Sequence, residues 1–219
     1  MIKVLVTSGG TRSYIDPVRV LTNISTGKLG QVMVETLSRV GIYDIYHVYA
    51  KGSLTADFTS PYYHKHEIST CEEAMAAIMN YVPNMDIVIH SMAVSDFGFK
   101  PTDEKLASNS PEDFINSLKS RIYKNPKILP LIKQLNPNCI LFSFKFENGI
   151  STGQLIDIAT RSMIKSNSDV VIANDKAEME KEKTHVSYFI SKEKLERIDG
   201  KENIALHIIE IIKNKINGK

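Results

Sequence analysis

The first 29 residues carry most of the groups that a phosphorylated ligand needs. An apolar segment, Ile2–Val6, has the composition of a buried strand, and Gly9-Gly10-Thr11-Arg12 follows it closely. Paired glycines let a backbone turn sharply and approach an anion. Further on, Ser25 or Thr26 is placed to cap a helix beginning near Gly27, whose free N–H groups attract negative charge. The stretch therefore predicts a site for a phosphorylated ligand.

Two familiar phosphate-binding patterns do not fit this stretch. A P-loop requires Gly-Lys followed by Ser or Thr, but Leu29 follows Lys28. A dinucleotide fingerprint runs directly from strand into helix and has an acidic residue at the tip of the second strand. Here a long segment through Pro17 intervenes, and the second strand ends at Tyr49-Ala50-Lys51. The site is thus neither a Walker site nor an ordinary dinucleotide site.

A second group of candidate residues follows a later buried strand, expected over 86–90. Ser91, Met92 and Asp96 come at its carboxyl end, where open α/β sheets bind their ligands. Arg161 and Lys165 stand four apart in a predicted helix, so both project from one face, although such charges are usually only solvated.

The elements that must position these residues follow from apolar periodicity and helix-end signals. Asn125 is expected to cap a helix with Pro126 at its first position. Strands alternate with helices, which predicts an α/β, Rossmann-like fold with a mostly parallel sheet and helices on both faces, in one domain over 1–219. Helices are expected over 27–40, 72–81, 152–166 and 201–216, with one more ending at 135, and Ser69 or Thr70 is expected to cap the second of these. Strands are expected over 43–50, 138–144, 169–175, 186–190 and 193–198, with a short one ending near 68. A charged loop is expected over 176–184.

Composition limits the classes of function. Apolar residues make up 42% and charged residues 24%, with a net charge of +2, which favours a globular protein over one that binds nucleic acid or a membrane. Met1 leads directly into the first strand without a signal peptide, so we expect a cytoplasmic protein. Cys71 and Cys139 are too few and too far apart for a disulfide framework or zinc cluster, and are predicted to be small buried side chains.

Three motifs together resemble a known family. Ser8-Gly9-Gly10-Thr11-Arg12, Asp16-Pro17-Val18-Arg19 and Asn23-Ile24-Ser25-Thr26-Gly27-Lys28 are similar to the opening of phosphopantothenate-cysteine ligases, and the likeness continues through nearly the whole chain. Residues 98–111 resemble that family's flexible flap, with its lysine motif at Lys105-Leu106-Ala107-Ser108. The resemblance adds this flap and a small β extension to the expected fold, and implies extended chain over 114–123, although Ser110-Pro111-Glu112-Asp113 is a good helix start.

The resemblance implies a reaction of coenzyme A biosynthesis. The carboxylate of 4′-phosphopantothenate would be activated by CTP with Mg²⁺, giving an acyl-cytidylate and pyrophosphate, and L-cysteine would displace CMP. Asn23 and Lys105 would be catalytic, while the phosphopantothenate would contact Arg19, Ser25, Gly27 and Lys28. The nucleotide would contact Gly9, Gly10, Thr11, Ser91, Met92, Asp96, Asn125, Pro126, Lys127, Ile128, Phe144, Arg161 and Lys165.

The family also implies partners. We expect a homodimer, no flavin, no metal ligands that the sequence assigns, and a separate phosphopantothenoylcysteine decarboxylase chain acting next. The choice between CTP and ATP stays open, because Ser143 stands where bacterial relatives usually have glycine.

Two alternatives remain at this stage. An NAD(P)-dependent reductase needs a Tyr-x-x-x-Lys pair, and Tyr123/Lys127 is interrupted by Pro126, while Tyr188/Lys192 lies in a strand pattern that separates the two by ~13 Å. A non-catalytic nucleotide sensor with the same fold would have little need of a flap lysine such as Lys105.

Overall fold

The fold is built on one twisted sheet, which a computed structural model describes for residues 1–106 and 110–217. Within these residues, eight strands form the sheet in the order β12-β11-β10-β9-β6-β1-β4-β5. Neighbours from β5 to β10 are parallel, and only β11 and β12 join antiparallel. The strands are β1 (Ile2–Ser8), β4 (Tyr43–Ala50), β5 (Tyr63–Ile68), β6 (Ile87–His90), β9 (Ile140–Glu147), β10 (Val170–Asp175), β11 (Val186–Ile190) and β12 (Leu195–Asp199). The expected Rossmann-like, mostly parallel α/β fold is confirmed.

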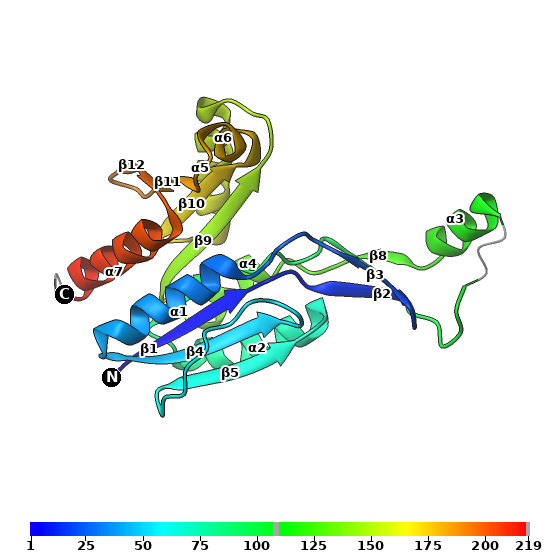
Figure 1. Ribbon diagram of the computed structural model, residues 1–219, viewed down its shortest axis with the longest axis horizontal. Coiled ribbons are helices and arrows are strands. Elements are labelled where there is room, and N and C mark those ends of the chain that lie inside the picture. Colours follow the sequence, from blue (N-terminus) through cyan, green and yellow to red (C-terminus); the bar gives the residue numbers. More distant parts are fainter. Residues whose placement is uncertain (107–109, 218–219) are drawn as a thin grey trace.

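Alternating side chains of the parallel strands fill two cores. Val4 and Val6 of β1 pack on α1 (Lys28–Val40) and α7 (Lys201–Asn217), which lie side by side on one face (Figure 1). Leu5 points to the opposite face, where α2 (Cys71–Tyr81) and α4 (Ile128–Leu135) cover it. α5 (Thr152–Ser166) covers β10 and β11 on that second face. Helices therefore cover both faces, as expected from strands that are apolar on both sides.

The sheet order reverses beside β1, since the chain adds β4 and β5 on one side and then returns to place β6 on the other. Beyond the carboxyl ends of these strands, two small antiparallel pairs extend away from the sheet toward α3 (Pro111–Lys119) (Figure 1). They are β2 (Arg12–Asp16) with β3 (Arg19–Thr22), and β7 (Phe97–Phe99) with β8 (Ile122–Lys124). We call β2 and β3 the arm.

Several local expectations were wrong. The stretch predicted as a charged loop over 176–184 contains α6 (Lys176–Glu182), because Asp175 caps it by accepting the Glu178 N–H at 3.0 Å. The segment 114–123, expected to be extended, is mostly α3. Ser110 caps the N-terminus of this helix by accepting the Asp113 N–H. Neither Ser25 nor Thr26 is the N-cap of α1, which is Gly27 with a left-handed φ of 74°.

Other elements match closely. α2 begins at Cys71 with a capping box from Thr70 and Glu73, and ends before a short 3-10 turn, η1 (Val82–Asn84). Cys71 and Cys139 are buried free thiols, as predicted. None of the helices in the described parts of the chain is both long and apolar enough to cross a membrane.

Two buried histidines hold the carboxyl end of β1. His47 Nε2 lies 2.8 Å from Ser8 Oγ, and His90 Nδ1 lies 2.8 Å from Thr7 Oγ1. Burial lowers the pKa of both to about 4, with a smaller contribution from Lys65 at His47. Both rings are therefore neutral in the folded protein at pH values where unfolded histidine is already protonated.

This difference makes stability depend on pH. The contribution of His47 and His90 to the free energy of unfolding should be constant above the unfolded pKa of 6.5. It should fall as the pH drops toward about 4, because only the unfolded state binds protons at these two rings in that range. At about pH 5, each ring should lower the free energy of unfolding by about 2 kcal/mol. In urea unfolding at several pH values, His47→Gln should flatten this dependence. Equal slopes in His47→Gln and wild type would contradict the assignment.

Candidate functional site

The turn after β1 forms the floor of the candidate site at the point where the sheet order reverses. Gly9 adopts a φ of 84°, and Gly10 pairs with Ala93 beyond the end of β6. The Thr11 N–H donates to the Ala93 carbonyl at 3.2 Å, and the Ala93 N–H donates to the Gly9 carbonyl at 2.8 Å. The two candidate segments therefore lie side by side and bring together Gly9, Gly10, Thr11, Ser91 and Met92.

Asn23 lies over this turn because Gly10 has no side chain. A Cβ on Gly10 would come 2.5 Å from the Asn23 carbonyl oxygen. Asn23 Nδ2 is 3.4 Å from the carbonyl of Ala93, and the side chain is exposed. The predicted catalytic asparagine thus stands at the carboxyl edge of the central strands, beside the segment that leads to Asp96.

The Asp96 segment is fixed from two directions. The buried hydroxyl of Thr11 accepts the Ser95 N–H at 2.9 Å, and Asn125 donates its Nδ2 to the Ser95 carbonyl at 2.9 Å. Asp96 forms an ion pair with Lys127 in which both side chains remain more than half exposed. Asp96, Asn125 and Lys127, all predicted to contact one ligand, therefore meet at one place.

Asn125 and Pro126 do not begin a helix as the sequence suggested. α4 begins at Ile128, and its N-cap is Lys127 without a side-chain cap. The buried Asn125 side chain is instead used for the Ser95 contact, and its Oδ1 has no hydrogen-bond partner among the described residues.

The N-terminus of α1 opens on the same edge. The Thr26 carbonyl accepts the Leu54 N–H at 2.9 Å, and a Cβ on Gly27 would come 2.8 Å from the Ser53 Cβ. Lys28 is exposed and its Nζ lies 3.2 Å from Gln31 Oε1. Ser25, Gly27 and Lys28 are consequently held next to the β1 turn.

Arg19 and the described part of the flap are in contact. Arg19 begins β3 and donates from Nη2 to the Leu106 carbonyl at 3.1 Å, while its guanidinium lies 4.9 Å from the Phe114 ring centroid. Lys105 precedes Leu106 and is exposed. Ala107 and Ser108 of the predicted lysine motif lie outside the described residues. The structure thus brings the arm and the flap lysine segment together.

Three predicted residues lie elsewhere or only at the margin. Phe144 stands one residue beyond the last pairing of β9 with β6, at the same edge as Ser91. Arg161 and Lys165 are exposed in the second half of α5, which runs back from the carboxyl end of β9 toward the amino end of β10. Within one chain they are not brought to the β1 turn.

Ser143 also faces away from the candidate site. Its hydroxyl donates to Ser168 Oγ at 2.8 Å inside the protein. The tyrosines of the two reductase-like pairs are likewise engaged, since Tyr123 in β8 donates to Glu72 and Tyr188 in β11 donates to Glu178, both at 2.7 Å.

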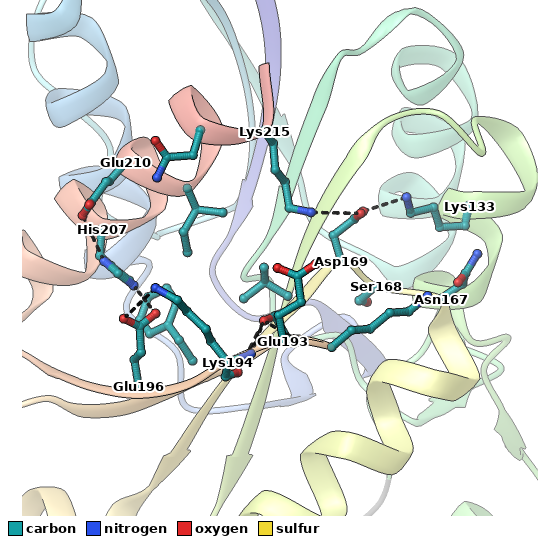
Figure 2. Close-up of a pocket in the computed structure, with 16 residues that line it drawn as sticks. Lys133, Asn167, Ser168, Asp169, Glu193, Lys194, Glu196, His207, Glu210 and Lys215 are labelled. Carbon is teal, nitrogen blue, oxygen red and sulfur yellow. Dashed lines mark hydrogen bonds and ion pairs between the residues drawn. The ribbon is translucent and has the colours of Figure 1, made fainter. Parts of the chain in front are cut away.

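The described structure also has a hollow at the opposite edge of the sheet from the candidate site (Figure 2). This cavity of about 640 Å³ lies between α7, the start of β10 and the β11–β12 turn. Asp169 is its central group and accepts from Lys133 Nζ at 2.7 Å and from the Leu141 N–H at 2.9 Å, with Lys215 3.8 Å away. These contacts tie strands to helices, and none of the sequence-predicted site residues lines the cavity. Its size alone therefore does not make it the candidate site.

No group of three or more His, Cys, Asp or Glu side chains suited to a metal ion occurs in residues 1–106 and 110–217. Sequence reasoning assigned no role to Asp16, which is buried and contacts both the arm and the flap. The signal available for it was the Asp-Pro turn that precedes Arg19.

Sheet order, glycine turn and clustered polar groups define a doubly wound α/β protein, with the candidate site at the switch point. Residues 1–216 match the family described as the DNA/pantothenate metabolism flavoprotein C-terminal domain, and the chain belongs to that family. The resemblance to phosphopantothenate-cysteine ligases, which the sequence motifs indicated, agrees with this match.

Individual relatives support the same placement. The chain is 32% identical over 217 residues to the coenzyme A biosynthesis bifunctional protein CoaBC of Methanocaldococcus jannaschii, covering 98% of this chain and 51% of the relative. Identity is 35% over 175 residues to the protein of that name from Thermococcus kodakarensis, with 78% of this chain and 41% of the relative covered. The chain therefore spans about half the length of these curated relatives.

Solved structures share the fold. The DNA/pantothenate metabolism flavoprotein from Streptococcus pneumoniae superposes with a TM-score of 0.84 at 31% identity, covering 98% of this chain and all of that one. A variant of Cab2 in complex with phosphopantothenate-cysteine superposes with a TM-score of 0.79 at 17% identity, covering 99% of this chain and 88% of that one.

The close approach of α1 to the β1 turn can be tested with two helix glycines. A Cβ on Gly30 would lie 2.3 Å from the Ser8 Cβ, whereas a Cβ on Gly153 in α5 meets nothing within 4 Å. Gly30→Ala should lower the free energy of unfolding by about 1–3 kcal/mol because the core cannot expand. Gly153→Ala should raise it by up to about 1 kcal/mol. Chemical denaturation would measure both, and two equal effects would contradict the predicted crowding.

Proposed function

We propose that this chain is a phosphopantothenate-cysteine ligase of coenzyme A biosynthesis. The observation that carries the proposal is the meeting of Asn23, the Gly10–Ala93 pairing and the Asp96 segment at the switch point, with the flap lysine segment held against the arm. The names of the curated relatives, each a coenzyme A biosynthesis protein, point to the same pathway. The shared fold also accommodates phosphopantothenate-cysteine in the Cab2 variant.

The proposed reaction has two steps. A carboxylate oxygen of 4′-phosphopantothenate attacks the α-phosphorus of CTP, the bond to the bridging oxygen breaks, and pyrophosphate leaves. The amine of L-cysteine then attacks the acyl carbon of the cytidylate, losing a proton as CMP departs and the amide forms. Both steps concentrate negative charge, so donors and cations fixed in advance lower the barrier.

The residues near the β1 turn supply those donors. Exposed Lys105 would neutralise charge on the α-phosphoryl group in the first step. Asn23, whose side-chain amide lies beside the Ala93 carbonyl, would donate to the oxyanion formed when cysteine attacks. Arg19 would bind the phosphate of phosphopantothenate through parallel hydrogen bonds, and the nucleotide would lie along Thr11, Asp96 and Asn125.

Magnesium would enter as the complex of the nucleotide triphosphate, because the described residues offer no carboxylate cluster of their own. Its chemistry would be to neutralise phosphate oxygens. The base is proposed to be cytosine, with adenine as the competing choice. Decarboxylation of the product, and any flavin that it requires, is assigned to a separate decarboxylase, and the reaction to the cytoplasm.

Product analysis would test the proposal. The purified protein should release CMP and pyrophosphate from CTP only when phosphopantothenate is present, and should form phosphopantothenoylcysteine when cysteine is added. Release of AMP from ATP in place of CMP from CTP would identify ATP as the co-substrate. Absence of pyrophosphate release from either nucleotide would refute the proposal.

Variants separate the two steps. Lys105→Ala should reduce pyrophosphate release roughly 100-fold or more, because the α-phosphoryl charge loses its cation. Asn23→Asp should instead allow the first step and let the acyl-cytidylate accumulate, which mass spectrometry would detect. Equal loss of both steps in the two variants would contradict these separate roles.

We further propose that the arm forms a homodimer contact. Exposed apolar side chains lie on it and beside it, namely Val18 at 65% in its turn, Val20 at 41% and Leu21 at 44% in β3, and Ile24 at 103% just after β3. Exposed apolar side chains gathered on one small ribbon favour a protein interface. In a two-fold symmetric dimer the same surface of each subunit faces the other, so the apolar arm of one copy would pack on the apolar arm of a second copy.

Ile24→Asp should convert a dimer into a monomer in sedimentation or light-scattering experiments, because a carboxylate cannot be buried there without a partner. Ile164→Asp, on the exposed face of α5 at 74%, is the matched control and should leave the mass unchanged. A wild-type monomer, or a dimer that persists in Ile24→Asp, would refute the arm contact.

A further inference from the structure

A buried carboxylate connects the arm to the flap. Asp16 is 1% exposed and ends β2. Its Oδ1 accepts the Val18 N–H at 2.9 Å, which fixes the turn between the two strands of the arm. Its Oδ2 accepts the Leu106 N–H at 3.1 Å, and Leu106 is the residue after Lys105. One side chain therefore holds both the arm turn and the flap backbone.

Arg19 completes the contact. Its Nε lies 3.6 Å from Asp16 Oδ2, and its Nη2 donates to the Leu106 carbonyl at 3.1 Å. Asp16 and Arg19 together thus satisfy both backbone polar groups of Leu106, as a neighbouring strand would. Because the peptide between Lys105 and Leu106 is fixed in this way, the Cα of Lys105 has a defined place relative to the arm.

We propose that Asp16 is a positioning residue that seats the flap lysine, Lys105, over the reaction centre. The proposal rests on the proposed function for its catalytic consequence, and on the contacts above for the seating itself. A carboxylate is required because two N–H groups and a guanidinium converge on it, and an amide side chain has only one acceptor oxygen.

The charged form of Asp16 persists at neutral pH. Burial alone would raise the pKa of its carboxyl, but the N–H groups of Val18 and Leu106 and the charge of Arg19 leave its pKa below the usual value. The contact with the flap is therefore a charge-assisted hydrogen bond, which is stronger than a neutral one.

Trypsin gives a direct readout of the seating. Lys105 is the only lysine or arginine between positions 101 and 118, and Pro101 protects the bond after Lys100, so cleavage in this stretch reports the Lys105–Leu106 bond. That bond carries the N–H that Asp16 holds. Asp16→Asn should speed its cleavage about 10-fold, because the seated state loses a charge-assisted hydrogen bond.

The matched control is Asp169→Asn at the opposite edge of the sheet (Figure 2). Asp169 also accepts one backbone N–H, from Leu141, and pairs with a cation, Lys133. This variant should leave the cleavage rate at Lys105 unchanged, as followed by the mass of the fragment 1–105. Equal rates for wild type and Asp16→Asn would overturn the proposal, whether or not the protein is a ligase.

Kinetics of the first step test the catalytic consequence. Asp16→Asn should lower the rate of pyrophosphate release about 10-fold or more. The loss should vanish in a Lys105→Ala background, since a residue that acts through Lys105 has nothing left to position. Independent, multiplicative losses would refute the positioning role.

A second variant covers the case in which Asp16→Asn does not fold. Leu106→Pro removes the flap N–H and leaves the buried carboxylate in place. It should reproduce the loss in pyrophosphate release in a protein that still folds, and a normal rate would refute the proposal. If wild type itself releases no pyrophosphate, the proposed function fails, and the trypsin experiment still decides the seating.

Discussion

The candidate site depends on the backbone pairing between Gly10 and Ala93 beyond the ends of β1 and β6. Parallel strands normally diverge into separate loops, but here the Thr11 N–H and the Ala93 N–H continue the ladder for another step. The Thr11 hydroxyl then fixes Ser95. Since a Cβ on Gly10 would strike Asn23, the same glycine that permits the pairing also lets the asparagine approach. One small residue thus sets the relative positions of three segments far apart in the sequence.

The fold and much of this site could be predicted because local signals agree with the global packing. β4 and α5 appear with the expected bounds, since their apolar periodicities are strong. Gly41 ends the helix that precedes β4, and Ser151 caps the start of α5. The meeting of Gly10 and Ser91 was predictable because parallel strands deliver their carboxyl ends to one edge, whereas the place of Asn23 was implied by the family resemblance. Strong patterns buried on both faces leave few alternative structures.

The failures have physical causes. α6 is so charged that its sequence resembles a loop, and its cap by Asp175 requires a carboxylate whose other contact, the Ile150 N–H, comes from a different loop. Asn125 has every local property of a helix cap, but a long-range contact with Ser95 takes its side chain. Tertiary contacts decided both cases. Arg161 and Lys165 share a helix face as expected, and their contact with a nucleotide stays a prediction.

The buried Asp16 suits a reaction that passes through an acyl-nucleotidylate. Such an anhydride is open to attack by water as well as by an amine, so a flap that closes without a defined seat would waste the intermediate. A flap held only by apolar contacts could slide, whereas hydrogen bonds to both polar groups of Leu106 admit one register. Under the proposed function, Arg19 would take part both in that seat and in binding the substrate phosphate, so the arm would link the two events. The order in which phosphate and flap arrive at Arg19 would then govern when Lys105 reaches the reacting phosphorus.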